Sequence, residues 1–484
     1  MTRNAGPARS AGRLARLVAC LLIPAAAAFL PAAGAAAETD NTVQVLTLEE
    51  ALAITLENNR DIHKAMELRR KLEGKYVEER AAALPQVTVT GNALLSGDES
   101  QKAFFGTSRN DVYQAQAGIS QPLFTYGQIG AAIRAARVGL ATADDQLRIF
   151  RQAALRDVSA AFHDILLARE LHFIALESRG QKERLLDEAQ KKRTAGTATD
   201  YDVLAAEVGL RNAEPPVIRA ENLVRTARER LRFLLGRDGR EVDVRGELAA
   251  EIALYPRYEE ALATAWTKRP ELSDLRNRIG ISEELIAIAR AGNKPRLDLN
   301  AAAGWKETDI GIADASGSTW SAGLFLTWPL FNGLRTRGQV AQAQSDRTTL
   351  RIEEAKLLDS VALECRDAVN AVRVAGEIVK AQSGTAAQAE RLLAMAEKGY
   401  EFGVKTKLEV DDAQLNLAQA RGSLAAARRD YLVARVNLAQ ATGTLGEESG
   451  AASSPAAEAW HPARSPIGIV REVLTGEPRL EERR

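Results

Sequence analysis

Cysteine, histidine and aromatic residues are scarce in this chain of 484 residues, which has two cysteines, four histidines and 5% aromatic side chains. Cys20 lies in an N-terminal apolar segment, so Cys365 would have no partner for an internal disulfide once that segment is removed. His163 and His172 are nine positions apart, whereas two metal ligands on one face of a helix are about four apart. We therefore expect no metal site and no cofactor.

An excess of charge of one sign is also missing, because 64 Lys and Arg residues balance 64 Asp and Glu residues. The first 37 residues hold four arginines and no acid, so the rest of the chain has 60 basic and 64 acidic side chains. A nucleic-acid-binding protein needs a strongly basic face, so we expect no nucleic-acid partner. The sequence has neither a P-loop nor a Gly-x-Ser-x-Gly motif, and we expect no enzyme activity.

Long hydrophobic runs are confined to the N-terminus. Four arginines up to Arg16 precede an apolar run from Leu17 to Leu30 and the small residues 35–37, which predicts a signal peptide over residues 1–37. A lipoprotein signal ending at Cys20 is the less favoured alternative, because almost no apolar stretch precedes it. No later run reaches the length of about 18 apolar residues that a transmembrane helix needs. An exported chain of this kind can be periplasmic, secreted or an outer-membrane barrel.

The chain contains an internal duplication with a period near 210 residues. The corresponding segments are 49–52 and 259–262, 84–85 and 294–295, 121–124 and 328–331, and 196–236 and 403–443. The first two pairs are shifted by 210 residues and the last by 207. This period is too long for a solenoid repeat, so it predicts two structural halves with one architecture.

Each half predicts a helix, a β-hairpin, a very long helix, a tight turn and a shorter helix, in that order. The first repeat, 38–245, has its hairpin at about 86–123 and its later helices at about 127–193 and 198–235. The second repeat, 246–446, has its hairpin at about 297–331 and its later helices at about 334–399 and 406–442. The first helix of the chain is expected to run without interruption from Leu46 to Ala83. Residues 447–484 are rich in Ser, Ala, Pro and Glu and are predicted to be disordered.

The predicted hairpins alternate with a period of two. Apolar residues from Leu297 to Trp305 alternate with smaller or more polar ones, and the same holds from Trp320 to Leu330. Strands of roughly 10 residues can cross a bilayer when they are tilted, and the tryptophans near the strand ends suit the aromatic girdles of membrane barrels. A surface hairpin on a soluble domain is the alternative interpretation.

The long helices cannot belong to a compact globule. No proline lies between Pro122 and Pro215 or between Pro329 and Pro455. Each helix of roughly 66 residues would be about 100 Å long, and it must therefore project. The second helix has apolar residues at coiled-coil steps of four and three, namely Leu357, Val361, Cys365, Ala368, Val372, Ala375 and Val379.

Pro215 and Pro216 interrupt the predicted shorter helix of the first half, where the second half has Gly422 and Ser423. Two prolines inside a helix remove hydrogen bonds and introduce steric clashes. The sequence therefore predicts a bend or a short break at this point.

Two hairpins give four strands per chain, which are too few to close a barrel. An open sheet in lipid would leave backbone groups without hydrogen bonds. Several copies must therefore combine, and three chains would supply twelve strands, an even number within the usual range for membrane barrels.

In the order and spacing of its motifs, the chain resembles the TolC family of outer-membrane efflux proteins, the outer membrane factors. The resemblance covers about residues 46–446. The motifs that carry it are Leu-Thr-Leu-Glu-Glu-Ala-Leu at 46–52 with Asn58-Asn59, the Pro-Leu-Phe turns at 122–127 and 329–333, and the segments 400–406 and 431–445.

The resemblance implies a mainly α fold with a β-barrel portion. Duplicated halves would give four transmembrane β-strands per chain, which contribute to a trimeric 12-stranded barrel on a long periplasmic α-helical coiled-coil tunnel. It further implies a homotrimer in the outer membrane that contacts outer-membrane lipid, a periplasmic adaptor (membrane fusion protein) and an inner-membrane pump or ABC exporter. The implied function is a passive exit duct for a tripartite efflux or type I secretion system. The alternative, a soluble periplasmic coiled-coil adaptor or scaffold, leaves the two tryptophan-bearing hairpins unexplained.

The resemblance also assigns two groups of site residues near the tight turns. The tips expected to contact the adaptor are Arg193, Gly196, Thr197, Gly403, Val404 and Thr406. The periplasmic gate is expected at Tyr400, Lys405, Glu409 and Asp412. Lys405 occupies a position where the family often has arginine, so a bidentate link would be lost there.

Two interpretations of the acidic gate residues remain open. In a trimer, Glu409 and Asp412 would place six carboxylates round a narrow mouth, and such a ring favours cations. Alternatively, Thr406 and Glu409 form a capping box at a helix start, as Thr199 and Asp202 do in the first half.

Overall fold

The computed structural model describes residues 44–97, 99–102, 106, 108–236, 241–249, 251–252, 255–309 and 314–447. All of these residues belong to one compact unit, Thr42–Arg484. The predicted signal peptide and the predicted tail beyond Glu447 lie outside the described residues.

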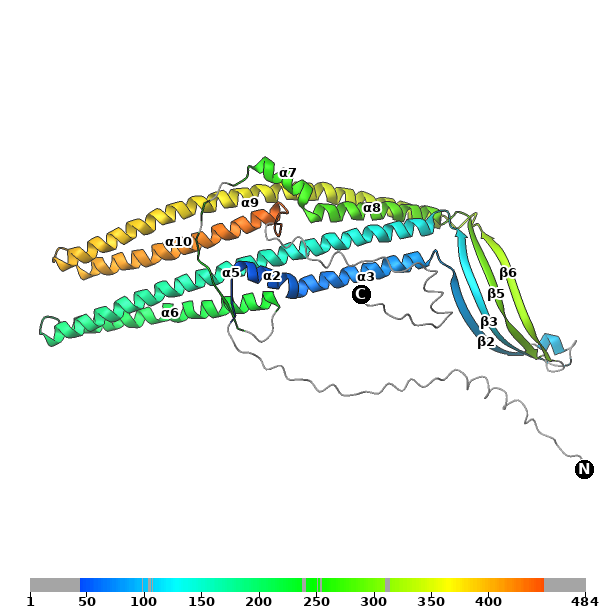
Figure 1. Ribbon diagram of the computed structural model, residues 1–484, viewed down its shortest axis with the longest axis horizontal. Helices are drawn as coiled ribbons and strands as arrows, with labels where there is room; N and C mark the ends of the chain where they lie inside the picture. The colour runs from blue at the N-terminus through cyan, green and yellow to red at the C-terminus, as the bar shows by residue number, and fades with distance from the viewer. Residues whose placement is uncertain are drawn as a thin grey trace, which may run out of the picture. The chain divides into compact units, whose positions relative to one another are not determined.

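The two halves of the unit contain the same series of main elements (Figure 1). The first half contains β1 (Gln44–Leu46), α2 (Leu48–Asn58), α3 (Arg60–Ala81), β2 (Gln86–Gly97), the short 3-10 helix η1 (Glu99–Gln101), β3 (Arg109–Phe124), α5 (Gln128–Thr194) and α6 (Asp200–Leu235). The second half contains β4 (Val242–Val244), α7 (Tyr258–Lys268), α8 (Pro270–Ala291), β5 (Arg296–Asp309), β6 (Asp314–Thr327), α9 (Arg335–Glu401) and α10 (Lys407–Ala441). Helices α5 and α9 both have 67 residues.

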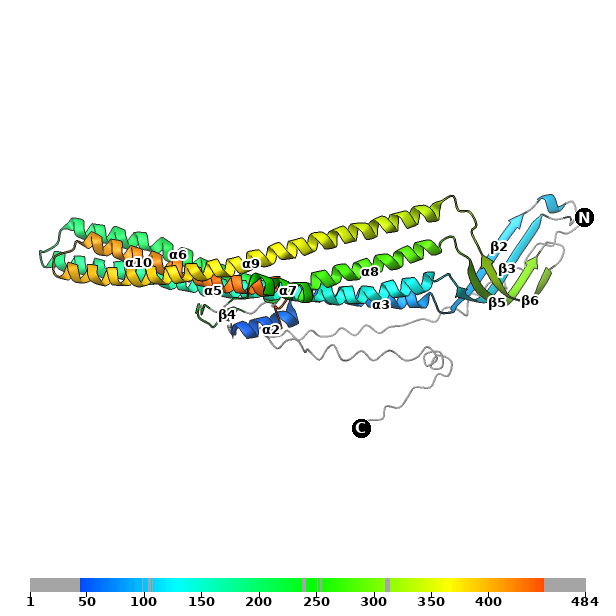
Figure 2. The ribbon, with the colours of Figure 1, turned by 90° about the horizontal axis from the view of Figure 1, so that it is seen from above.

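The four long strands form one antiparallel sheet in the order β2-β3-β5-β6. Figures 1 and 2 place this sheet beyond the ends of α3, α5, α8 and α9. The outer strands β2 and β6 each have one free edge among the described residues. A separate parallel pair joins β1 to β4, with Gln44 opposite Val242.

Helix α5 lies at the centre of the helical part, where it packs against α3, α6, α8 and α10. Helix α9 packs against α7, α8 and α10. The predicted coiled-coil seam of α9 is confirmed, because Val361, Cys365, Val372 and Val379 are buried and the other three predicted positions are half-buried. Towards the turn, alanines such as Ala389 and Ala413 fill the contact of α9 with α10 and let the two helices approach closely.

Among the helices of the described residues, none combines the length and the apolar character that a membrane crossing requires.

The prediction of a bend or break at Pro215 and Pro216 is wrong, because α6 continues through both residues. The two prolines are exposed, as are Arg211 and Asn212, whose carbonyl oxygens lose their helical donors. Water can satisfy these carbonyls on the exposed side. On the opposite side of α6, Val217 is buried in the contact with α5. This packing keeps α6 continuous although two of its backbone hydrogen bonds are missing.

The first helix of the chain is not continuous from Leu46 to Ala83, because it divides into α2 and α3 at Asn59. The Asn59 backbone is extended, and its side-chain oxygen accepts hydrogen bonds from the backbone N–H groups of Asp61 and Ile62. Its side-chain amide donates to the carbonyl of Leu234 at 2.8 Å. One asparagine therefore starts α3 and also ties it to the end of α6.

The C-terminal end of α6 lies against the break between α2 and α3, and the C-terminal end of α10 lies against the break between α7 and α8. Gly236 and Gly443 both have positive φ, at +67° and +75°. A Cβ atom on Gly236 would lie 2.3 Å from the Asn58 carbonyl oxygen, and one on Gly443 would lie 2.8 Å from the carbonyl carbon of Lys268. Neither position can hold a side chain without backbone movement.

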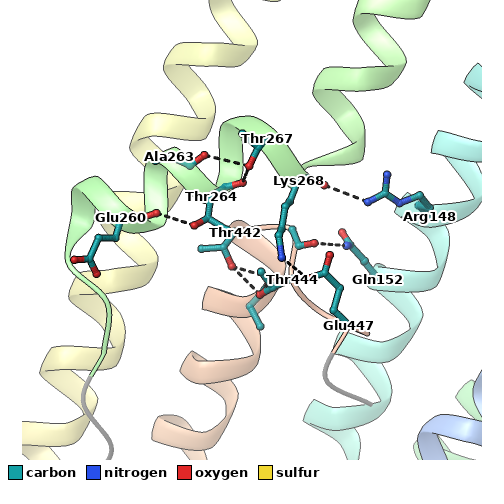
Figure 3. A network of polar contacts seen from close by, with 12 residues as sticks. Arg148, Gln152, Glu260, Ala263, Thr264, Thr267, Lys268, Thr442, Thr444 and Glu447 are labelled. Atoms are coloured by element: carbon teal, nitrogen blue, oxygen red, sulfur yellow. Dashed lines mark hydrogen bonds and ion pairs between the residues drawn. The ribbon is translucent and has the colours of Figure 1, made fainter. Parts of the chain in front are cut away.

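Polar contacts fix the second of these junctions (Figure 3). Arg148 and Gln152 of α5 donate to the carbonyl oxygens of Lys268 and Gly443 at 3.3 and 3.1 Å. The Lys268 ammonium lies 2.5 Å from the carboxylate of Glu447. Helices α5, α7 and α10 thus meet at one point. This junction fixes the position of the α9–α10 hairpin relative to α5 and α7.

We predict that Gly443→Ala lowers the free energy of unfolding by about 2 kcal/mol, because it adds a backbone clash to an unfavourable φ. The measurement is the midpoint of thermal loss of helical circular dichroism in detergent. The matched control is Gly384→Ala, since Gly384 lies within α9 with open space around it and is expected to tolerate alanine. Equal midpoints for the two variants would contradict the proposed role of this junction.

Candidate functional site

The candidate site consists of the two turns that join α5 to α6 and α9 to α10, which lie at the end of the helices remote from the sheet (Figure 1). Gly196 and Gly403 adopt positive φ values of +77° and +72°. The backbone N–H of Thr197 donates to the carbonyl of Lys192, and that of Val404 donates to the carbonyl of Gly399, both at 2.8 Å. The two turns therefore close in the same way, and both need glycine for its left-handed backbone conformation.

Both shorter helices begin with a capping box, which confirms the structural interpretation of the acidic residues at 202 and 409. The backbone N–H of Thr406 donates to Glu409 Oε2 at 2.8 Å, and the N–H of Glu409 donates back to Thr406 Oγ1 at 3.3 Å. Thr199 and Asp202 make the equivalent pair of hydrogen bonds in the first half. These bonds satisfy backbone donors at the start of each helix.

Glu409 has a second partner, because the Lys405 ammonium lies 2.6 Å from its Oε1 atom. The hydrogen bond from Lys405, followed by those from Thr406, lowers the pKa of Glu409 to about 2. Glu409 is therefore ionised throughout the physiological pH range. Both of its oxygens already have partners within the chain.

The structure brings only some of the predicted gate residues into contact. Lys405 and Glu409 form an ion pair, and the Tyr400 ring lies 5.8 Å from the Nζ atom of Lys192 on α5. Asp412 is exposed and makes no side-chain hydrogen bond or ion pair to any described residue. Of the two carboxylates predicted for the gate, each chain therefore has one that is neutralised, Glu409, and one that is free of partners among the described residues, Asp412.

The predicted tip residues divide into turn-forming and exposed groups. Arg193 pairs with Asp200 across the first turn at 2.6 Å, and Thr197 Oγ1 donates to the carbonyl of Lys192 at 3.0 Å. Val404, by contrast, is 78% exposed, and its neighbour Phe402 is 80% exposed. The second tip therefore presents apolar side chains to its surroundings.

Three ion pairs between α10 and α5 were not predicted from the sequence. They are Lys182–Asp411 at 2.9 Å, Arg421–Glu177 at 2.8 Å and Arg429–Asp164 at 2.6 Å. Together with Lys192–Tyr400, they bind the second helical hairpin to the first along its length. The partners are 229 to 265 positions apart in sequence, so no local pattern marks them.

A groove of about 930 Å³ lies between α5, α6 and β4. Arg169 and Arg228 in its lining both pair with Asp243. Among the described residues, no group of His, Cys, Asp and Glu side chains could hold a metal ion. The groove thus has a charged lining in which Asp243 is already paired with two arginines.

The comparisons with known proteins agree with this geometry. The family model of outer membrane efflux proteins matches residues 51–237 and 261–444, one segment in each half. This chain belongs to the outer membrane efflux protein family. Membership confirms the predicted family and, with it, a passive outer-membrane channel of an efflux or secretion system that extends into the periplasm and is not an enzyme. It does not support the soluble adaptor alternative.

Among curated relatives, the alkaline protease secretion protein AprF of Pseudomonas aeruginosa is 28% identical over 377 residues, which cover 73% of this chain and 75% of the relative. The toluene efflux pump outer membrane protein TtgC of Pseudomonas putida is 24% identical over 391 residues, or 80% of each chain. The outer membrane protein TolC of Vibrio cholerae is 24% identical over 365 residues, which cover 73% of this chain and 81% of the relative.

Solved structures confirm the predicted fold class. The CmeC outer membrane channel of Campylobacter jejuni has a TM-score of 0.72 at 16% identity, covering 84% of this chain and 90% of that one. The open MtrE outer membrane channel of Neisseria gonorrhoeae has a TM-score of 0.69 at 19% identity, with coverages of 82% and 89%.

We predict that Thr406→Ala increases amide hydrogen exchange in the first turn of α10 about fivefold, because loss of an N-cap destabilises a helix start by about 1 kcal/mol. Exchange would be followed by mass spectrometry at neutral pH. Thr385→Ala is the matched control, since Thr385 is an exposed threonine within α9 whose hydroxyl bonds only to the preceding turn. Equal exchange in α10 for both variants would show that the cap contributes nothing there.

Proposed function

We propose that three copies of this chain form an outer-membrane duct that receives its substrates from an inner-membrane pump or ABC exporter through a periplasmic adaptor. The observation that carries this proposal is the four-stranded sheet with free edges on β2 and β6. Lipid offers no hydrogen bonds to such edges, so the sheet needs further copies to close.

The strand count and the exposed side chains favour a trimeric barrel in contact with outer-membrane lipid. Three copies of four strands give twelve, within the range of membrane barrels. On β6 and just beyond it, Trp320, Leu324, Leu326 and Trp328 are all more than half exposed and occupy alternate positions. A row of this kind suits the lipid face of a barrel, with tryptophan at its two ends.

The long helices would supply the periplasmic part of the duct. Each has 67 residues and is therefore about 100 Å long. The names of relatives, which include a secretion protein and an efflux pump outer membrane protein, support a partner that drives transport.

The far end of the duct would be closed by Tyr400, Lys405, Glu409 and Asp412. In a trimer, Glu409 and Asp412 together contribute six carboxylates. Glu409 is held by Lys405 and by its helix cap, so Asp412 has the greater freedom to bind cations at the mouth. We assign the cation-binding ring mainly to Asp412, with Glu409 in a supporting position.

The adaptor would contact the tips at Arg193, Gly196, Thr197, Gly403, Val404 and Thr406. Exposed Val404 and Phe402 offer an apolar contact there, and the ion pair of Arg193 with Asp200 holds the first turn in shape. These two exposed apolar side chains suit a partner that covers them with apolar surface of its own.

The experiment that tests the proposal combines fractionation with reconstitution. The protein should appear in detergent extracts of outer membranes, have the mass of a trimer by light scattering, and conduct ions in planar bilayers. A water-soluble monomer that does not insert into bilayers would overturn the proposal.

We predict that Glu409→Ala/Asp412→Ala raises the single-channel conductance and weakens block by multivalent cations. The physical reason is the loss of the carboxylates that hold multivalent cations at the mouth, where bound cations obstruct the passage of other ions. The double variant Asp200→Ala/Asp202→Ala removes the same charge from the other hairpin tip and serves as the control. Unchanged conductance and block in the first variant would remove the gate assignment.

A further inference from the structure

We infer that β6 of one copy pairs with β2 of the next copy in a defined register, in which Thr327 lies opposite Thr90 of the next copy. This inference rests on the proposed trimer and adds residue-level contacts to it. It comes from the internal duplication, because the contact between the halves within one chain should be repeated by the contact between chains.

The first step is that two constant shifts relate the helices and the long strands of the two halves. Helix α3 becomes α8 with a shift of 210 residues, and α5 becomes α9 with a shift of 207. The strand pairing obeys the same shifts. Val87 of β2 lies opposite Ile119 of β3, and the shifted residues Leu297 and Leu326 also lie opposite each other. The two shifts therefore relate residues that occupy equivalent positions in the paired strands, and not only residues that are similar in sequence.

The second step applies the shifts to the contact between the halves. Within the chain, β3 pairs with β5, and Ser120 lies opposite Asn300. Moving Ser120 forward by 207 residues gives Thr327 on β6, and moving Asn300 back by 210 gives Thr90 on β2. The pair Gln114 and Lys306 similarly becomes Ser321 and Ser96.

The resulting register keeps both faces of the sheet consistent. It places Leu326, Leu324 and Ala322 opposite Gly91, Ala93 and Leu95 of the next copy, so apolar side meets apolar side. It places Ser321 and Thr327 opposite Ser96 and Thr90 on the other side. A slip by one residue would move every polar residue of one strand to the lipid side, which makes odd-numbered slips unfavourable.

The helices next to the sheet extend the same contact. Within the chain, α5 packs on α8, so α9 should pack on α3 of the next copy. The hydrogen bond from Gln146 to Asp274, at 3.0 Å, corresponds to Glu353 and Lys64, which are exposed and of opposite charge. The positions equivalent to the ion pair of Arg134 with Glu284 are Ala341 on α9 and Gly74 on α3 of the next copy. Both residues are small, which lets these two helices approach closely.

Cysteine cross-linking tests the register in the full-length protein. In a Cys365→Ser background, the pairs Thr90→Cys/Thr327→Cys and Ser96→Cys/Ser321→Cys should give covalent trimers after mild oxidation in membranes. The shifted pairs Asn92→Cys/Thr327→Cys and Thr88→Cys/Thr327→Cys are the controls, because diagonal neighbours lie beyond the usual reach of a disulfide. We expect at least tenfold more cross-linked trimer from the matched pairs.

The outcomes separate the register from the trimer itself. Efficient cross-linking of a shifted pair, or of none of the pairs in a protein that light scattering finds trimeric, would overturn the register and leave the trimer intact. Absence of any oligomer would overturn both.

A charge swap tests the helical contact. Glu353→Lys and Lys64→Glu should each speed dissociation of the trimer about twofold at low salt, as expected for an exposed pair, and the double variant should restore the original rate. Additive losses in the double variant would overturn this pairing.

Discussion

Unpaired backbone on the two outer strands is the constraint on which the rest of this molecule depends. Strands β2 and β6 each offer hydrogen-bonding groups along one edge, and a bilayer provides nothing to bind them. The sheet is therefore complete only in an assembly. Because the helices continue from the strands, closure of the sheet also determines how the long helices of neighbouring copies come together, and thus how wide the path between them is.

Ion pairs join the α9–α10 hairpin to the α5–α6 hairpin of the same chain, and the internal duplication does not account for them. Helix α10 is held to α5 by three ion pairs, including Lys182–Asp411. The shifted counterparts of Lys182 and Asp411 are Ala389 and Leu204, which carry no charge. Charge therefore strengthens this contact within a chain, and the shifted positions of the Lys182–Asp411 pair cannot repeat that ion pair between chains.

Most of the fold could be predicted because its determinants are local and periodic. The seam residues Val361 and Val372 follow a helical period, and the caps at Thr199 and Thr406 are short motifs. Prediction failed at Pro215 because the outcome depended on which side of α6 faced water. The ion pairs between α10 and α5 could not be found from one sequence, because their partners are far apart along the chain.

The change of shift from 210 to 207 residues has a practical consequence. The second hairpin is three residues shorter than the first. The whole difference lies in the connection between its two strands, so the strand register and the positions of the helices are the same in both halves. The two connections therefore differ in length without any change in the pairing of the strands that they join. An epitope or affinity tag placed between Gly97 and Arg109 would be displayed at the cell exterior, on the rim opposite the helices, without altering the wall of the conduit.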